Sequence, residues 1–402
     1  MEQHKIIRLR DFYKDYLLKN SIPFWIKNSL DQKYGGYLTC LDREGKVYNT
    51  DKSVWFQGRG TWIFSRLYNM VEKREEWLDA ARIGYEFLIK YCFDSDGRMF
   101  FQVTQDGRPL QKRRYAFSEM FAIMAFAEYY KATGNPEAYK KAIAVYNTLL
   151  SIYRNTLEIT PKINPETRPM KGHSFYMMLL CVTQAVREID DNAVYDEIIG
   201  DLINILFKDF VKPDKKALFE TVGPNGELID NPQGRCINPG HSIETSWFLM
   251  HEGIYRNDTD LIRRAMEVLE WSLELGWDKE YGGLLYYVDI DGKPADQLEW
   301  DMKLWWPHTE ALYALLLAVY LTGDVKYESW YEKVHEWSFG HFEDKIYGDW
   351  FGYLHRDGTV SNTLKGSMWK GHFHLPRALL FSHILLDKMA SGEKFDCFRG
   401  KI

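Results

Sequence analysis

The sequence predicts an all-α (α/α)6 barrel with short β-hairpins at one mouth. One observation is a repeat: five segments begin with an acidic residue, continue through an aromatic or apolar stretch and contain a glycine turn. The other is that long apolar segments of helical character lie between these repeats. The length agrees, because 402 residues exceed the roughly 250–300 that one ordinary compact core accommodates.

The repeat has a period of about sixty residues. Its segments start at positions 31, 94, 214, 278 and 344, so their spacings are 63, 120, 64 and 66. The spacing of 120 is two periods of 60, which predicts a copy near residue 155 that has lost its hairpin. Six such units fill most of the chain and indicate a repetitive architecture. Glycine turns after apolar stretches predict hairpins at 31–46, 94–108, 214–227, 278–293 and 344–358.

The segments between the hairpins are predicted helices, with inner helices lining a central cavity and outer helices wrapping them. Six units favour closure over an open α-solenoid, and no polar capping repeat is evident. No linker rich in Pro, Gly or Ser divides the chain, so residues 1–402 are interpreted as one barrel domain. The clearest helical patterns lie at 84–91, 120–132, 173–186 and 308–321.

Composition and charge exclude several classes of protein. The chain is 46% hydrophobic and carries a net charge of −6, which argues against a nucleic-acid surface. The longest strongly apolar run, 311–321, is too short for a membrane span, which needs roughly 20 residues. The first twenty residues contain no continuous apolar stretch of a secretory signal. Five scattered cysteines support neither disulfides nor thiolate zinc sites, so we expect a cytoplasmic location.

Two segments combine histidine, carboxylate and tryptophan at a predicted helix start. Segment 238–250 reads NPGHSIETSWFLM, and its Pro-Gly pair places His241 in the first turn, with Glu244 and Trp247 following at spacings of three on one face. Segment 297–312 reads QLEWDMKLWWPHTEAL and clusters Trp306, His308 and Glu310 beside a proline that is typical of a helix start. A charged pair inside an apolar helix needs a reason, which favours a functional role for the first segment.

Two further segments complete the candidate site. Segment 365–377, KGSMWKGHFHLPR, contains His372 and His374 beside a glycine, and segment 54–63 contains Trp55 and Arg59. His173 is a close decision between a structural and a functional role. We interpret the remaining histidines as structural; these are His4, His251, His335, His341, His355 and His383.

These residue types suit proton transfer on a sugar. Imidazole titrates near neutral pH, with an ordinary pKa of about 6.5, and an adjacent carboxylate can hold its tautomer. Tryptophan faces stack on sugar CH groups, and arginine offers fixed donors to an oxyanion. The histidines do not form the HExxH pattern, so no metal site is predicted. Neither GxGxxG after a strand nor GxxxxGK[ST] occurs, so nucleotide catalysis is not indicated.

The chain resembles the N-acylglucosamine 2-epimerases, also called renin-binding proteins in mammals. The resemblance runs nearly end to end, and its most specific strings are DREGKVY, VWFQGRGTW, NPGHSIETSWFL, QLEWDMKLWWPHTEA, YGDWFGYLHRDGTV and KGHFHLPR. It implies an (α/α)6 barrel, a homodimer and no required cofactor. Relatives are activated by ATP, so ATP is a candidate allosteric activator here, although no phosphate-cradling loop is visible.

The resemblance also implies residue roles. His241 and His374 match the two essential histidines, Arg59 the substrate-contacting arginine, and Glu244 and Glu310 their acidic partners. The chain departs from many members at 171–176 (KGHSFY), where the N-acyl pocket is expected to differ. The substrate-binding residues we predict are Trp306, Trp247, His308, His173, Trp55 and His372.

The predicted function is therefore interconversion of N-acetylglucosamine and N-acetylmannosamine, by histidine-mediated removal and return of the C2 proton of the open-chain sugar. An aldose–ketose isomerase of mannose type and a cellobiose-type 2-epimerase on the same barrel remain alternatives. A glycoside hydrolase would need two carboxylates about 5–10 Å apart across the bond, whereas the candidate carboxylates here lie beside histidines. A protein-binding module is the non-enzymatic alternative.

Overall fold

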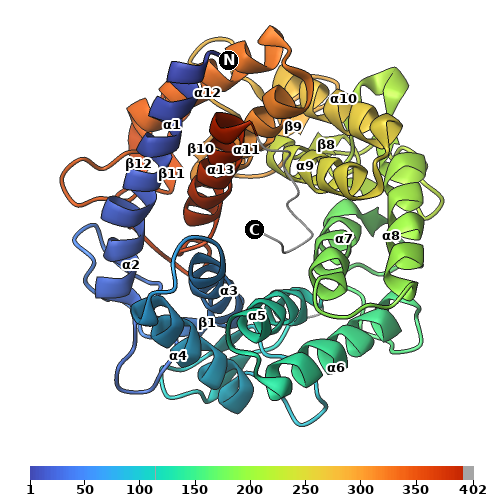
Figure 1. The fold of residues 1–402 in the computed structure, drawn as a ribbon. Helices are drawn as coiled ribbons and strands as arrows, with labels where there is room; N and C mark the ends of the chain where they lie inside the picture. Colours follow the sequence, from blue (N-terminus) through green and yellow to red (C-terminus); the bar gives the residue numbers. More distant parts are fainter. Residues whose placement is uncertain (114, 393–402) are drawn as a thin grey trace.

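The computed structural model describes residues 1–113 and 115–392. An inner ring of helices surrounds the barrel axis, and each helix packs against the next (Figure 1). The last inner helix also packs against the first, which closes the ring and confirms the predicted (α/α)6 barrel. The inner helices are α3 (Val54–Met70), α5 (Phe117–Thr133), α7 (His173–Arg187), α9 (Pro239–Arg256), α11 (Trp305–Thr322) and α13 (His374–Ser391).

The outer helices wrap this ring; six of those described pack against inner helices, whereas α2 packs mainly against the π-helical segment Tyr16–Ser21 (Figure 1). The two layers differ in burial, as their positions require: α11 is buried on every side from Trp305 to Val319, whereas α10 buries a single stripe that includes Leu261, Ala265 and Leu269. The outer helices are α1 (Gln3–Asp15), α2 (Ile22–Ser29), α4 (Glu75–Tyr91), α6 (Pro136–Tyr153), α8 (Val194–Ile205), α10 (Thr259–Gly276) and α12 (Val325–His341).

The predicted hairpins lie between an outer helix and the next inner helix, but they are shorter than a regular ladder. Most internal pairs are single bridges, such as Leu30 with Tyr37 and Trp277 with Leu284. The glycine turns are confirmed, because the glycine of each predicted turn has a positive φ that other residues rarely adopt. These glycines are Gly45, Gly107, Gly226, Gly292 and Gly358.

Neighbouring units are joined by backbone pairing. The two-residue strand that precedes an inner helix pairs antiparallel with the hairpin of the following unit, so the starts of the inner helices are fixed relative to one another. The pairs are β1 (Lys52–Ser53) with β2 (Gln102–Val103), β4 (Lys171–Gly172) with β7 (Thr221–Val222), β8 (Cys236–Ile237) with β9 (Val288–Asp289), and β10 (Lys303–Leu304) with β11 (Tyr353–Leu354). The remaining strands are β3 (Pro109–Gln111), β12 (Val360–Asn362), β5 (Val211–Lys212) and β6 (Ala217–Leu218).

A buried ion pair recurs at this end of the barrel. Lys52 reaches Asp31 at 2.8 Å and Lys303 reaches Asp278 at 2.9 Å, and the side chains are at most 3% exposed. In both cases the lysine lies two residues before an inner helix and the aspartate opens the preceding hairpin. The aspartate also accepts hydrogen bonds from two backbone N–H groups of its own turn. At Asp31 and Asp278, the acidic start of the sequence repeat therefore has a structural role.

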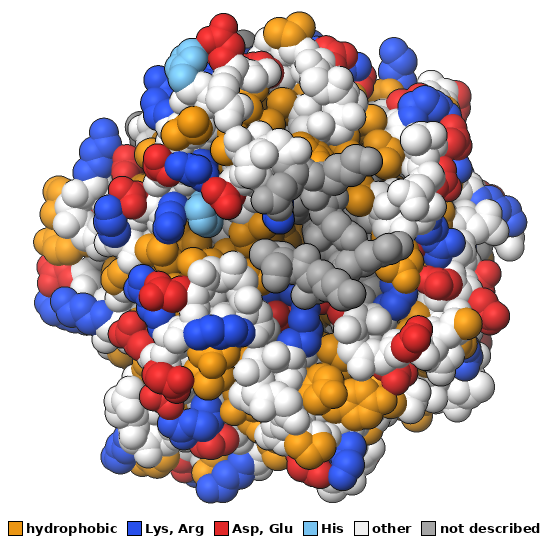
Figure 2. Space-filling view, viewed as in Figure 1, with side chains coloured by type: hydrophobic (Ala, Val, Ile, Leu, Met, Phe, Trp, Pro, Cys, Tyr) orange, Lys and Arg blue, Asp and Glu red, His pale blue; other side chains and the backbone are white. Residues whose placement is uncertain are grey.

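Other expectations can be compared with the described residues. Residues 154–170 contain no strand, which confirms that the copy near residue 155 lacks its hairpin. None of the described helices is long and apolar enough to cross a bilayer. The four described cysteines are free, and Cys397 lies outside the described residues. On the face shown in Figure 2, Lys and Arg side chains are interspersed with Asp and Glu, without a continuous basic field.

We expect Asp278→Asn to lower the free energy of unfolding by about 3–5 kcal/mol, because it leaves the buried Lys303 ammonium without its counter-charge. Urea unfolding followed by circular dichroism measures this. The matched control is Asp230→Asn, since Asp230 is 90% exposed and its ion pair with Arg235 contributes less than about 1 kcal/mol. Equal losses of unfolding free energy in the two variants would show that burial does not strengthen the ion pair of Asp278 with Lys303.

Candidate active site

A cavity of about 540 Å3 lies at the end of the barrel where the inner helices begin. That volume lies within the roughly 300–1,000 Å3 of common ligand pockets, so a sugar has room to enter. Its wall combines aromatic rings with a few charged groups. The lining includes Trp55, Arg59, Phe117, Phe121, Met177, Met178, His241, Glu244, Tyr286, Trp306, Tyr353, Trp369, His374 and Arg377.

His374, the first residue of α13, is held by a buried carboxylate. Its Nδ1 lies 2.8 Å from Oε1 of Glu310 on α11, and Trp247 donates its indole N–H to the other oxygen of Glu310 at 2.9 Å. Arg377, one turn further along α13, donates to Glu310 at 2.7 Å and to Glu244 at 2.5 Å. The carboxylate accepts, so Nδ1 carries the hydrogen and Nε2 is the nitrogen available to a substrate.

Burial lowers the pKa of His374 well below its ordinary value, and the positive charges of Arg377 and Arg59 lower it further. His374 is therefore neutral at pH 7. Burial also lowers the pKa of Arg377, but Glu310 and Glu244 outweigh burial and leave its pKa raised, so this guanidinium stays charged.

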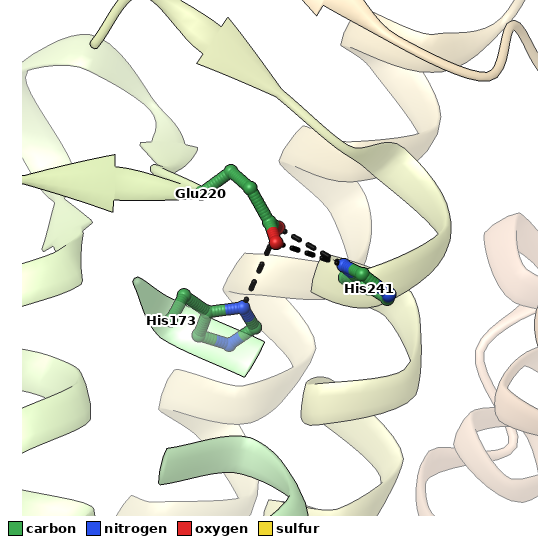
Figure 3. Close-up of side chains that lie close together, drawn as sticks. All are labelled: His173, Glu220 and His241. Atoms are coloured by element: carbon green, nitrogen blue, oxygen red, sulfur yellow. Dashed lines mark hydrogen bonds and ion pairs between the residues drawn. The ribbon is translucent and has the colours of Figure 1, made fainter. Parts of the chain in front are cut away.

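His241 lies in the first turn of α9 and is held by a different carboxylate. Its Nδ1 lies 3.1 and 3.0 Å from the two oxygens of Glu220 (Figure 3). Burial lowers the pKa of His241, but the charge of Glu220 outweighs it and leaves the pKa above 6.5. Burial raises the pKa of Glu220, yet the charge of His241 is the largest opposing effect and the pKa falls to about 2, so this carboxylate is ionised throughout the neutral range.

The indole of Trp306 lies close to both histidines. Its ring centre lies 5.1 Å from that of His241 and 5.7 Å from that of His374, and it is tilted by 39° to each. Both imidazoles therefore face the cavity beside one aromatic surface, on which a sugar ring can stack.

Arg59 of α3 provides a positive charge in the same cavity. Its guanidinium packs over Phe121 at 4.0 Å and Phe373 at 4.9 Å, and its Nε is buried without a hydrogen-bond partner among the described residues. Burial lowers its pKa to about 9, with Glu244 and Glu310 opposing that effect, so it remains protonated at neutral pH. Such a group is suited to an oxyanion of the substrate.

Within residues 1–113 and 115–392, two groups of side chains have ligand atoms within 4.8 Å of one another and could hold a metal ion. One is His173, Glu220 and His241, and the other is Glu244, Glu310 and His374. In the second group the guanidinium of Arg377 already bonds both carboxylates, so a cation is present between them. In the first, Glu220 bonds His241 directly.

Some of the predicted site residues lie at the cavity wall and others do not. It brings His241, His374, Arg59, Trp306 and Trp55 to the cavity wall. Glu310 contacts His374 as an acidic partner should, and Glu244 lines the cavity. Glu244, which follows His241 at a spacing of three, bonds Arg377 of α13 and acts on His241 only at longer range.

Four predicted substrate-binding residues lie away from the cavity wall. Trp247 is 4% exposed and orients Glu310 through its indole N–H, and His173 lies behind Glu220. His308 is fully buried, accepts the N–H of Leu284 and bonds the carbonyl of Leu304 at 2.7 Å, so both ring nitrogens serve the fold. His372 is buried among aromatic rings, without a hydrogen-bond partner in the described chain.

Two contributors were missed from the sequence. Arg377 lies in the string KGHFHLPR but received no role, although an arginine one turn after His374 on an inner helix is itself a signal. Glu220 offers only a weak signal, a single acid within the apolar stretch LFETV. Its contact with His241 depends on how neighbouring units pair.

The comparisons with known proteins agree with this geometry. The profile of the family N-acylglucosamine 2-epimerase (GlcNAc 2-epimerase) matches residues 36–376. The chain belongs to the N-acylglucosamine 2-epimerase family. It is 38% identical to the N-acylglucosamine 2-epimerase of Bos taurus over 382 residues, which cover 93% of this chain and 90% of that protein.

The chain is also similar, more distantly, to cellobiose 2-epimerases. The cellobiose 2-epimerase of Dictyoglomus turgidum is 28% identical over 391 residues, covering 91% of this chain and 96% of that protein. The solved cellobiose 2-epimerase of Bacillus thermoamylovorans superimposes with a TM-score of 0.82 at 22% identity, covering 93% of this chain and 98% of that one. Enzymes that rearrange sugars at C2 thus build the same barrel.

We expect acid to destabilise the protein through buried neutral histidines such as His372. Burial lowers the pKa of His372 to about 3, whereas the unfolded chain has a pKa near 6.5. The unfolded state therefore binds the extra proton, and the stability present above pH 6.5 is lost as the pH falls from 6.5 toward 3. In His372→Phe, unfolding free energies measured between pH 6 and 4 should fall less steeply, by about 1.4 kcal/mol per pH unit. An unchanged slope would contradict a neutral His372.

Proposed function

We propose that this protein is an N-acylglucosamine 2-epimerase that interconverts N-acetylglucosamine and N-acetylmannosamine. The observation that carries the proposal is the pair His241 and His374, both beside Trp306 and each held at Nδ1 by a carboxylate. Inversion at a carbon requires a base on one face and an acid on the other, and two such imidazoles supply both.

The chemistry begins with the open-chain sugar, because the C2 proton is acidic only when C1 is an aldehyde. One histidine removes H2 through Nε2, the C2–H electron pair moves into the C1–C2 bond, and the carbonyl pair moves to O1. The resulting enolate oxygen needs a preorganised donor, for which Arg59 is our candidate; one such donor contributes roughly 3–4 kcal/mol.

The second half returns a proton to the other face of C2. The other histidine donates it, the C1 carbonyl forms again, and the configuration at C2 is inverted. The substrate and its C2 epimer have the same oxidation state, so the reaction is redox-neutral and needs no oxidant. The two histidines exchange roles when the direction of reaction is reversed.

The cavity wall formed by α5 and α7 supports the assignment of an N-acyl sugar as substrate. Phe117, Phe121, Met177 and Met178 line the cavity there, and their apolar surface suits an acyl methyl group. The 38% identity to the bovine N-acylglucosamine 2-epimerase, against 28% to a cellobiose 2-epimerase, points the same way.

We further propose that the enzyme needs no cofactor, works as a homodimer in the cytoplasm and serves the breakdown of sialic acid through N-acetylmannosamine. The free described cysteines are compatible with a reducing compartment. ATP is proposed only as an allosteric activator, because the mechanism uses no phosphate. Sedimentation velocity tests the dimer.

The first experiment incubates the protein with N-acetylmannosamine in D2O, with EDTA present, with and without ATP. We expect proton NMR to show N-acetylglucosamine carrying deuterium at C2, because the histidines exchange their protons with solvent. A lack of product and of exchange under all conditions would refute the N-acyl assignment. Turnover of mannose to fructose, or of cellobiose, would instead favour the alternative sugar isomerases.

We expect His241→Ala and His374→Ala each to lower kcat by about 10²–10⁴-fold, because each removes one acid or base. His355→Ala is the matched control, since His355 is exposed and lies outside the cavity wall. Circular dichroism establishes that the variants fold. Near wild-type turnover by either variant would show that the two-histidine assignment is wrong.

A further inference from the structure

Glu220 lies between two imidazoles that come from different helices. Its carboxylate contacts Nδ1 of His241 at 3.0 Å and approaches Nδ1 of His173 at 3.7 Å, and the side chain of His173 is fully buried (Figure 3). We propose that Glu220 is a positioning residue: it sets the tautomer, orientation and charge of His241, while His173 keeps Glu220 available for that role. The consequence for turnover rests on the proposed epimerase function; the link between the residues does not.

The tautomer of His241 follows from hydrogen-bond chemistry. An ionised carboxylate can only accept, so the hydrogen between the two groups belongs to Nδ1 of His241. Nε2 is then the nitrogen that gives or takes a proton at the cavity. The backbone N–H of His241 is bound by Asn238 at 3.0 Å, which fixes the residue in the first turn of α9.

The backbone holds Glu220 at its position. The register of β4 with β7 pairs Gly172 with Thr221, and the adjoining N–H of His173 donates to the carbonyl of Glu220 at 2.9 Å. On the other side, the N–H of Glu220 donates to the carbonyl of Cys236 at 3.4 Å. Glu220 is thus anchored to the strands that lead into α7 and α9, which carry its two imidazole partners.

His173 is arranged so that it does not compete for Glu220 when it is neutral. The hydroxyl of Thr245 donates its hydrogen to the carbonyl of His241 at 2.8 Å, so it must accept from Nε2 of His173 at 2.9 Å. Nδ1 of a neutral His173 then carries no hydrogen and has no hydrogen-bond partner in the described chain. Burial lowers the pKa of His173, which maintains this neutral state.

Several other charged groups face His241, but none contacts its ring. Glu244 on its own helix and Glu310 on α11 act at longer range, and His374 and Arg377 on α13 and Arg59 on α3 lie across the cavity. Tyr286 and Tyr287 lie near Glu220, and burial raises the pKa of both, so they are neutral. Removing the charge of Glu220 is therefore expected to lower the pKa of His241.

The test is Glu220→Gln in the full chain, with Glu227→Gln as the matched control. Glu227 belongs to the same hairpin segment, and its carboxylate accepts hydrogen bonds from Asn225 rather than from a histidine. NMR titration of the His241 imidazole, in protein with ¹³C-labelled histidine and assigned with His241→Ala, reads its pKa without any substrate. The pH dependence of kcat with N-acetylmannosamine reads the same group during turnover.

We expect Glu220→Gln to lower the pKa of His241 by at least about one pH unit, to shift the kcat profile in the same direction and to lower kcat at least about tenfold. Glu227→Gln should change neither. Glu220→Asp keeps the charge but shortens the side chain. Compared with Glu220→Gln, it should restore the pKa of His241 more fully than it restores kcat.

An unchanged pKa of His241 in Glu220→Gln would overturn the proposal, whether or not activity is lost, because loss of activity alone would indicate a structural role. If the wild type shows no turnover while the pKa shift is present, the proposed function fails and the link between Glu220 and His241 stands.

Discussion

The active site depends on the burial of four charges around one cavity. Glu244, Glu310 and Arg377 have side chains that are at most 6% exposed, and their desolvation costs several kcal/mol for each ion. Arg377 bonds both carboxylates, which leaves one negative charge in excess, and Arg59 across the cavity balances it. This balance explains why Arg59 stays protonated without a direct partner: the two carboxylates oppose the effect of its burial.

The architecture adds a second constraint, since all six inner helices start at the cavity. Helix N-termini carry partial positive charge, so this end of the barrel favours an enolate oxygen and disfavours an imidazolium. This effect favours the neutral form of the histidines placed there, His241 in α9 and His374 at the start of α13. His374 is neutral, whereas at His241 the charge of Glu220 opposes the effect and raises the pKa.

The sequence could predict what is periodic or local. The repeat predicted the barrel, and the Pro-Gly pair placed His241 in the first turn of a helix, where the structure has it. It could not predict contacts that join distant units. Glu244 turns to Arg377, 133 positions away, although the helical spacing suggested His241. His308 appeared in a site motif, yet two backbone hydrogen bonds bury it in the fold.

Glu220 illustrates the same limit most clearly. The register of β4 with β7, two-residue strands from consecutive units, determines which side chains Glu220 contacts. A shift of one residue would turn its side chain to the other face, and the hydrophobic alternation of so short a strand does not specify that register. Only the closed ring, which fixes the starts of α7 and α9 relative to each other, determines it.

The two histidines are chemically identical but differ electrostatically, and this difference matters for inversion. Glu310 shares its charge with Arg377, whose guanidinium lies 3.3 Å from His374, whereas Glu220 has no cation among the described residues to compete with His241. The pKa of His374 is accordingly depressed and that of His241 raised. A site that removes a proton from one face and returns one to the other needs a neutral base and a protonated acid at the same moment. Because the charges around the two histidines differ, one imidazole can be neutral while the other is protonated at the same pH.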